Sequence, residues 1–202
     1  MKQICFIILS FLFAATSFSQ VEYGVKGGLN LATVRYLNDD NTKARLGFNT
    51  GFFAEVPVQE NLFVRPELLY SSKGYGYSAA QYSREGVLKL NYINIPLLIG
   101  FRPSNKVALL AGPEIGFLQK SVSKSQGITT DMTSFYRHFD VGFDLGIAYS
   151  VNKFFGFEGR YNYGFKDLVN VLVTDNLGNV VGQGKTGANS VLQVGLYYFL
   201  SK

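Results

Sequence analysis

The side chain best suited to proton transfer in this sequence is that of His138, the only histidine. Asp140 follows closely, and an aspartate beside a histidine can orient a general base. The preceding segment, 121–137, offers hydroxyl nucleophiles at Ser121, Ser123, Ser125 and Ser134. Composition alone would place one histidine near a serine-rich segment, and no phosphate loop, metal-ligand spacing or nucleophile elbow accompanies it. We therefore predict no catalytic residues and no enzymatic activity.

Three carboxylates, those of Asp140, Asp144 and Glu158, lie in the same part of the sequence. Grouped carboxylates can coordinate a cation. Basic residues accompany them, however, and Arg160 lies close to Glu158. Because a buried carboxylate beside a guanidinium forms an ion pair, salt bridges are favoured over metal coordination. We predict no metal site and no cofactor.

An alternation of apolar and polar residues shows which elements position these side chains. In segment 138–152 one face is apolar, with Phe139, Val141, Phe143, Leu145, Ile147, Tyr149 and Val151. The opposite face carries His138, Asp140, Asp144 and small residues. Segment 154–166 repeats this pattern, with aromatic residues alternating with Glu158, Arg160 and Asn162. A period of two predicts β-strands that each have one apolar face.

The chain contains eight such stretches. The predicted strands span 22–33, 44–58, 62–75, 86–101, 106–120, 138–152, 154–166 and 188–201. Long connections, at about 34–43, 76–85, 121–137 and 167–187, alternate with short ones at 59–61, 102–105 and around Asn152-Lys153. Outer-membrane barrels have this asymmetry, with short periplasmic turns and longer extracellular loops. We predict an all-β fold, an eight-stranded antiparallel up-and-down transmembrane β-barrel.

The N-terminus has the order of a secretory signal. Met1-Lys2 is followed by an apolar run from Ile4 to Ala15 and then by small residues up to Ser19. This order predicts a signal peptide over residues 1–19, with a barrel domain over 20–202. The apolar run is shorter than the roughly 20 residues that a transmembrane helix needs. Cys5, the only cysteine, lies within it, so we expect neither a lipoprotein anchor nor disulfides in the mature chain.

The composition fits a β-structure with an apolar exterior. The chain has 18 Phe, 13 Tyr and 22 Gly among 202 residues, and no Trp. After residue 20 no continuous apolar stretch has the length of a helical membrane span, which argues against a helical membrane protein. The formal net charge is +5, but the basic residues are scattered, so we predict no nucleic-acid partner.

Charged residues of the predicted strands fall on the face opposite to the apolar one. A Lys or Arg that faces lipid at the membrane midplane costs about 2 to 4 kcal/mol, which explains their exclusion from the outer face. In segment 86–101 the apolar residues change phase, which predicts a β-bulge near Tyr92 and places Lys89 inside. The predicted inward set is Glu22, Lys26, Glu55, Arg65, Glu67, Lys73, Lys89, Glu114, Lys120, Asp140, Asp144, Glu158 and Arg160.

These inward charges are nearly balanced in sign, and we interpret them as an ion-pair network that plugs the lumen. Eight strands enclose a space just wide enough for side chains to fill it. Isolated ions in such a space cost several kcal/mol each, so each carboxylate needs a basic partner. Strand order brings Asp140 and Asp144 near Arg160, and Glu55 near Arg65. A selective ion path along the same charges is the alternative.

Three motifs carry a resemblance to a known family. They are Arg65-Pro66-Glu67-Leu68-Leu69-Tyr70 with Lys73-Gly74, Tyr92-Ile93-Asn94-Ile95-Pro96-Leu97-Leu98, and Ala111-Gly112-Pro113-Glu114-Ile115-Gly116. With them the chain resembles the PorT-like, or porin-family, outer-membrane β-barrels of Bacteroidota from about residue 21 to its end. The resemblance implies an eight-stranded barrel and, in some relatives, a part in secretion-system assembly or gliding. Asn94 departs from the family, whose members often carry Glu there.

We therefore predict a non-enzymatic protein of the cell outer membrane. Its plugged barrel would act in envelope structure or in interactions through extracellular loops, including functions in secretion or assembly. A narrow solute or ion channel is the alternative, and behind it a lipid A modifying enzyme or a protease. Segment 167–187 predicts a hairpin above the membrane that could offer strand edges to a protein partner. The other expected partners are outer membrane lipid and the barrel-assembly machinery.

Overall fold

The computed structural model describes residues 21–35, 42–77, 85–169, 171–174, 180–184 and 187–201. The expected signal peptide lies outside these residues. Within them eight long strands form the barrel wall: β1 (Glu22–Arg35), β2 (Thr42–Gln59), β3 (Leu62–Tyr77), β4 (Gly86–Ser104), β5 (Val107–Ser125), β7 (Phe139–Ser150), β8 (Phe155–Gly164) and β11 (Ala188–Ser201).

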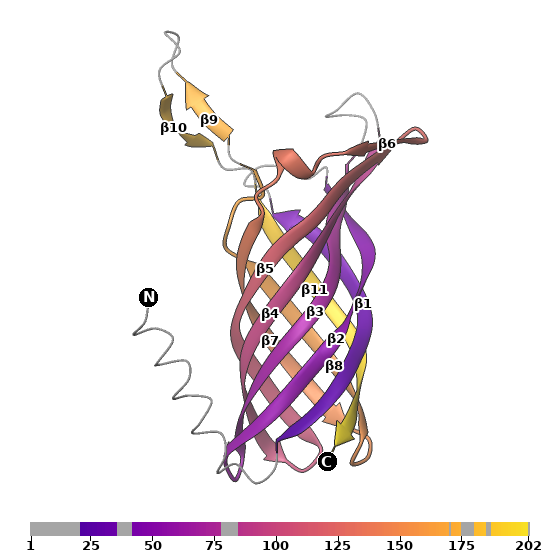
Figure 1. The fold of residues 1–202 in the computed structure, drawn as a ribbon, viewed down its shortest axis with the longest axis vertical. Helices are drawn as coiled ribbons and strands as arrows, with labels where there is room; N and C mark the ends of the chain where they lie inside the picture. Colours follow the sequence, from indigo (N-terminus) through magenta and orange to yellow (C-terminus); the bar gives the residue numbers. More distant parts are fainter. Residues whose placement is uncertain are drawn as a thin grey trace, which may run out of the picture.

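Each wall strand pairs antiparallel with the next one along the chain, and β11 closes the ring on β1 (Figure 1). The closing register runs from Tyr23 opposite Ser201 to Arg35 opposite Ala188. The prediction of an eight-stranded antiparallel up-and-down barrel is confirmed. Closure matters for stability, because a ring leaves no strand edge with unpaired backbone groups.

The two ends of the barrel differ in the length of their connections. Short turns at 60–61, 105–106 and 151–154 join strands at the end where β11 finishes. At the other end β5 continues through a turn at Gln126 and Gly127, both with positive φ, into β6 (Ile128–Asp131), followed by the 3-10 helix η2 (Thr133–Phe135). Much of the expected loop 121–137 is therefore a hairpin.

A second hairpin projects from the same end in Figure 1. Strands β9 (Val171–Thr174) and β10 (Val180–Gly184) pair antiparallel and form a separate two-stranded sheet. The hairpin predicted within 167–187 is confirmed. Its expected turn, 175–179, lies outside the described residues.

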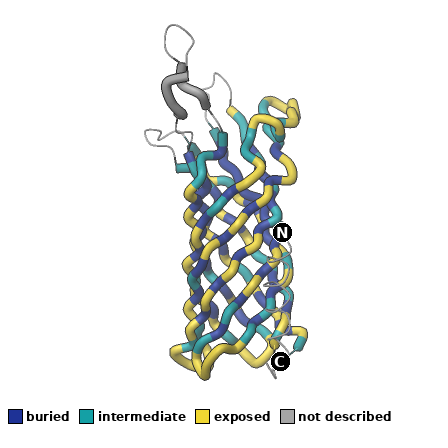
Figure 2. Tube along the Cα trace, turned by 60° about the vertical axis from the view of Figure 1, so that its left-hand side comes forward, coloured by how far each residue is buried: buried dark blue, intermediate teal, exposed yellow. Residues whose placement is uncertain are grey.

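Buried and exposed residues alternate along the wall strands, as the tube in Figure 2 shows. On β7 the side chains of Leu145 and Ile147 are exposed, whereas Asp140 and Asp144 are buried. Apolar residues thus cover the outside and polar ones the inside, the reverse of a soluble protein and the arrangement expected for a wall facing lipid. Within the described residues, no helix is long and apolar enough to cross a membrane.

Inward aromatic side chains near the short-turn end lie over glycines of the neighbouring strand. Phe63 on β3 is paired with Gly100 on β4, and Tyr197 on β11 with Gly156 on β8. A β-carbon added at either glycine would collide with the facing ring. The absence of a side chain at these glycines therefore leaves room for the aromatic rings inside the barrel, as is common in strongly curved sheets.

A β-bulge on β5 changes which residues face inward. Asn91 is opposite Lys120, but Tyr92 is opposite Leu118, so Gln119 is an extra residue on β5. Strand β4 itself keeps one phase, with Leu88, Leu90 and Tyr92 buried. The predicted change of phase in segment 86–101 is wrong. The irregularity is at the expected height, but the extra residue belongs to the partner strand.

Candidate functional site

The candidate site is the network of charged side chains buried inside the barrel, with Arg160 at its centre. Arg160 donates hydrogen bonds to both carboxylate oxygens of Glu67, from Nη1 to Oε2 at 2.9 Å and from Nη2 to Oε1 at 2.7 Å. It also reaches Glu158 at 2.7 Å and Asp144 at 3.2 Å. Paired parallel hydrogen bonds of this kind are among the strongest polar contacts in proteins, so Arg160 ties together strands β3, β7 and β8.

Lys26 and Arg65 complete the central cluster. The Lys26 ammonium donates to Glu158 at 2.5 Å and lies 3.4 Å from a Glu67 oxygen. Arg65 donates to the other Glu158 oxygen at 2.9 Å, and its Nε lies 3.3 Å from Glu67 and 3.7 Å from Glu55. Each carboxylate of the centre is thus shared by several bases, which offsets the cost of removing the charges from water. The expected Glu55–Arg65 contact is present.

A second cluster lies beside the first, around Glu114 on β5. Lys73 and Asn94 each donate to Glu114 at 2.8 Å, and Asn162 donates to it at 3.0 Å. Asn162 also donates to Asp144 at 2.7 Å, which links this cluster to the central one. The three motifs that carry the family resemblance therefore meet inside the barrel. The first supplies Arg65, Glu67 and Lys73, the second Asn94 and the third Glu114.

The two aspartates of β7 have different partners. Asp144 pairs with Arg160 as expected. Asp140 instead accepts a hydrogen bond from the Asn189 amide at 2.8 Å and one from the Val141 backbone at 2.9 Å. A buried carboxylate can be satisfied by such neutral donors as well as by a base. Asn189 was not singled out by the sequence pattern, since an amide on a strand carries no charge signal.

Two members of the predicted inward set, Lys89 and Lys120, do not point into the lumen. Lys120 is exposed, because the extra residue Gln119 turns it outward and places Ser121 inside. Lys89 alternates with the buried Leu88 and Leu90 and so lies on the outer face. The charges inside are therefore not nearly balanced. Acidic side chains outnumber the basic ones, Lys26, Arg65, Lys73 and Arg160.

Amides and an additional arginine compensate part of this imbalance. Arg102, at the end of β4, forms an ion pair with Glu55 and lies 3.9 Å from the half-buried Glu22. Its guanidinium also stacks on the ring of Phe63, at 4.1 Å from the centroid. The prediction placed Arg102 in the short connection 102–105 and did not include it among the inward charges. An arginine that directly follows a strand of alternating pattern is the signal that could have found it.

Apolar clusters lie inside the barrel on both sides of the charges. Toward the short turns one cluster contains Phe53, Phe63, Leu98, Leu110, Ala148, Tyr197 and Phe199. Toward the long connections the other contains Val34, Tyr75, Leu88, Leu90, Tyr92, Leu118 and Leu168. Leu168 comes from the segment after β8 and lies across the barrel mouth, fixed by backbone hydrogen bonds with Arg137 and Gly187. This contribution of a connecting segment was not predicted.

The residues considered for catalysis are not brought together. His138 is exposed just before β7, whereas Asp140 is buried and bonded to Asn189. The segment around it is held by local contacts. Thr133 donates to Asp131 from its hydroxyl at 2.6 Å and its backbone at 2.9 Å, and these bonds hold the pKa of the Asp131 carboxyl below its usual range. Among the described residues, no group of His, Cys, Asp and Glu could hold a metal ion.

Comparison with known proteins fits this architecture. Residues 13–170 match the family model of the outer membrane protein beta-barrel domain. The chain belongs to this outer membrane β-barrel family. It is accordingly a protein of the outer membrane, and its outward apolar residues face lipid.

Solved structures of outer membrane barrels share the fold. Neisserial surface protein A matches with a TM-score of 0.56 and 14% identity, covering 89% of this chain and 99% of that one. Ail of Yersinia pestis, in complex with the heparin analogue sucrose octasulfate, matches with a TM-score of 0.52 and 15% identity, covering 90% and 99%. A major outer membrane protein of Thermus thermophilus matches at 0.50 and 15%, covering 89% and 99%. Among curated proteins no sequence matches significantly.

Proposed function

We propose that this outer membrane barrel is a non-enzymatic protein with a closed lumen. It serves envelope structure or binds partners through its extracellular segments. The observation that carries the proposal is the buried network around Arg160, enclosed between two apolar clusters. Ions need water or a continuous polar lining to cross a membrane. Side chains that are paired with one another and covered by apolar layers offer neither.

The network supports a structural interpretation for a second reason. Several of its ion pairs connect strands that are not neighbours in the ring. Lys26 on β1 reaches Glu158 on β8, and Lys73 on β3 reaches Glu114 on β5. Contacts across the lumen fix the cross-section of the barrel. They would have to break for a path to open, and the free energy needed for that opposes the channel alternative.

The non-enzymatic assignment rests on the separation of the only histidine from the buried acids. We propose that His138→Ala leaves the envelope function of the protein unchanged. Loss of a lipid A modification or of a proteolytic activity in that variant, with the barrel still folded, would favour the enzyme alternative.

The extracellular hairpins support the interaction part of the proposal. The β5–β6 hairpin carries Ile128 beside its turn, and the side chain of Ile128 is 61% exposed. Contiguous exposed apolar patches mark surfaces that bind a protein, and we propose that Ile128 forms part of such a surface. We include in the proposal the kinship with PorT-like barrels of Bacteroidota and a function in secretion or assembly. The motifs around Glu67 and Glu114 support this kinship.

Export belongs to the same proposal. Residues 1–19 would direct the chain across the inner membrane and be removed, and the barrel-assembly machinery would then insert it. Mass spectrometry of the protein from outer membranes would test this. An N-terminus at Gln20 is expected, and retention of residues 1–19 would contradict it.

A solute-uptake assay tests the closed lumen. Liposomes that contain the purified protein should not swell faster in isotonic arabinose than empty liposomes do. Swelling comparable with that of a porin would contradict the proposal.

A photoreactive amino acid at Ile128 in living cells tests the interaction part. It should form discrete protein adducts, whereas the same probe at Lys153 in the opposite turn should not. Absence of adducts at Ile128 would leave envelope structure as the function.

A further inference from the structure

On the side formed by β2 to β5, the outward face of the wall strands carries charged side chains only toward the end with the long connections. On β4 the outward residues from Ile93 to Phe101 are apolar, and this length suits the 9–11 residues with which a tilted strand crosses the hydrocarbon region. Toward the extracellular end the next outward residues of β4 are Asn91 and Lys89. On β5 the bulge at Gln119 is followed by outward Lys120 and Lys124.

Strand pairing places these bases in adjacent rows of the same outward surface. Lys43 on β2 is opposite Gly76 on β3, Gly76 is opposite Val87 on β4, and Val87 is opposite Lys124 on β5. One row across four strands therefore has a lysine at each end. In the adjacent row Lys89 is opposite Gly74. Lys89 is also opposite Val122 on β5, two residues before Lys124.

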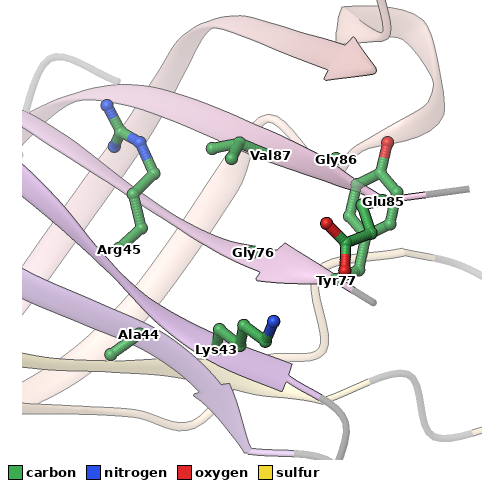
Figure 3. Close-up of a pocket in the computed structure, with 8 residues that line it drawn as sticks. All are labelled: Lys43, Ala44, Arg45, Gly76, Tyr77, Glu85, Gly86 and Val87. Atoms are coloured by element: carbon green, nitrogen blue, oxygen red, sulfur yellow. The ribbon is translucent and has the colours of Figure 1, made fainter. Parts of the chain in front are cut away.

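The rows enclose a hollow in the outer surface. It has a volume of about 390 Å³, and its lining includes Lys43, Arg45, Gly76 and Val87. Figure 3 shows Lys43 and Arg45 of β2 on two sides of Gly76, with Val87 beyond it. The floor is open because Gly76 carries no side chain. Arg45 is held in place by hydrogen bonds to Ser72 Oγ at 3.2 Å and to the Lys73 carbonyl at 2.8 Å.

We propose that this hollow binds the phosphate group of an outer-leaflet glycolipid. Lys43 and Arg45 line the hollow, and Lys89, Lys120 and Lys124 lie at outward positions of β4 and β5 beside it. The residues that line it lie beyond the apolar stretch from Ile93 to Phe101 of β4, on the side of the long connections, where the headgroups of the outer leaflet would lie. Several bases around a pocket of this size match the charge and the oxygen acceptors of a phosphate, and none of the four lysines forms an ion pair within the part of the chain that the structure describes.

Other bases at the same end are engaged differently. The Arg35 guanidinium lies 3.4 Å from the Tyr163 ring centroid and donates to the Gly164 carbonyl, while Lys166 lies 4.4 Å from the Phe139 centroid. Within the described residues, two acidic groups lie near these bases. Glu85 lines the hollow beside Tyr77, and the Asp131 carboxylate near Lys120 accepts two hydrogen bonds from Thr133. The side of β2 to β5 therefore offers the available positive charge.

Native mass spectrometry of the purified protein in dodecylmaltoside tests the site. The protein is titrated with bisphosphorylated lipid A, dephosphorylated lipid A or inorganic phosphate. We expect tight binding of the bisphosphorylated lipid only. The triple variant Lys43→Ala, Lys89→Ala, Lys124→Ala should bind it about 100-fold more weakly, as expected when three bases near a charged headgroup are lost.

The matched control is the triple variant Lys106→Ala, Lys153→Ala, Lys166→Ala, which removes the same charge away from the hollow. It should bind like the unmodified protein. Equal weakening in both triple variants, or equal binding of the dephosphorylated lipid, would overturn the proposal. Binding of inorganic phosphate as tight as that of the lipid would also overturn it, because the ligand would then be a free anion. Heat-modifiable mobility on gels shows that each variant is folded, so a loss of binding reports on the site.

Discussion

Arg160 on β8 and Glu67 on β3 form a paired ion contact across the full width of the barrel, in which Nη1 donates to Oε2 and Nη2 donates to Oε1. In the ring, β3 and β8 are separated by β2, β1 and β11 on one side and by β4, β5 and β7 on the other. Both side chains are almost completely buried. The pair therefore connects opposite sides of the barrel wall, and the other buried charges lie around it.

Arg160→Ala should destabilise the barrel by about 3 to 5 kcal/mol, because it leaves buried carboxylates without their partner. Urea unfolding in lipid vesicles measures the loss. Arg160→Lys, which keeps the charge but not the paired hydrogen bonds, should lie between the alanine variant and the unmodified protein. A free energy of unfolding within about 1 kcal/mol of the unmodified value for the alanine variant would mean that the cluster is not buried from water.

Asn94→Glu should also destabilise the protein. Asn94 is fully buried and donates to Glu114, so a carboxylate there would face another carboxylate and remove a donor. We expect a loss of about 1 to 3 kcal/mol. The double variant Asn94→Glu, Glu114→Gln should recover much of it, since one amide and one acid then meet again. Equal stability of Asn94→Glu and the unmodified protein would show that the family's carboxylate is tolerated by this network.

Leu145→Arg should impair insertion and stability. Leu145 is 56% exposed and lies in the middle of the outward apolar face of β7, where an arginine costs about 2 to 4 kcal/mol. Val151→Arg, in the turn after the strand, is the control and should cost about 1 kcal/mol or less. Folding yield in vesicles compares them. Equal yields would mean that β7 does not face the hydrocarbon at Leu145.

Gly100→Ala should lower stability by about 1 to 3 kcal/mol, because the new methyl group collides with the Phe63 ring and the core must shift. Gly159→Ala is the matched control, since a β-carbon there meets nothing within 4 Å. Thermal unfolding of both variants separates a packing effect from a general effect of glycine on a strand. Similar losses of stability at the two positions would show that the packing of the Phe63 ring does not require a glycine at position 100.

The inward and outward faces of most wall strands could be predicted, because the alternation depends on the residues of a single strand. A strand facing lipid on one side alternates, so Leu145 and Asp144 could be assigned to opposite faces from β7 alone. Lys120 could not be placed in this way. A single extra residue, Gln119, reverses the phase of β5, and a bulge depends on the pairing between two strands rather than on one strand's pattern.

The interior could be predicted only in part, for a similar reason. The Arg160–Asp144 contact follows from neighbouring strands, whereas the Arg160–Glu67 contact depends on the diameter of the closed ring. The prediction that Lys89 faces inward implied that its neighbours Leu88 and Leu90 face lipid. They lie inside because the lumen has an apolar layer that includes Leu168, from a connecting segment with no periodic pattern.

The central claim, a closed lumen, is tested most directly by conductance. Purified protein is inserted into planar lipid bilayers, and the current is recorded in 1 M KCl over a range of voltages. Binding of an antibody to the protein in the bilayer shows that it has inserted. The Arg160→Ala variant, measured in the same way, should conduct, because water can enter beside the unpaired carboxylates. The unmodified protein is predicted to show no stable open state. Steady, ion-selective conductance from the unmodified protein would show that the charges around Arg160 line a path and would contradict the account.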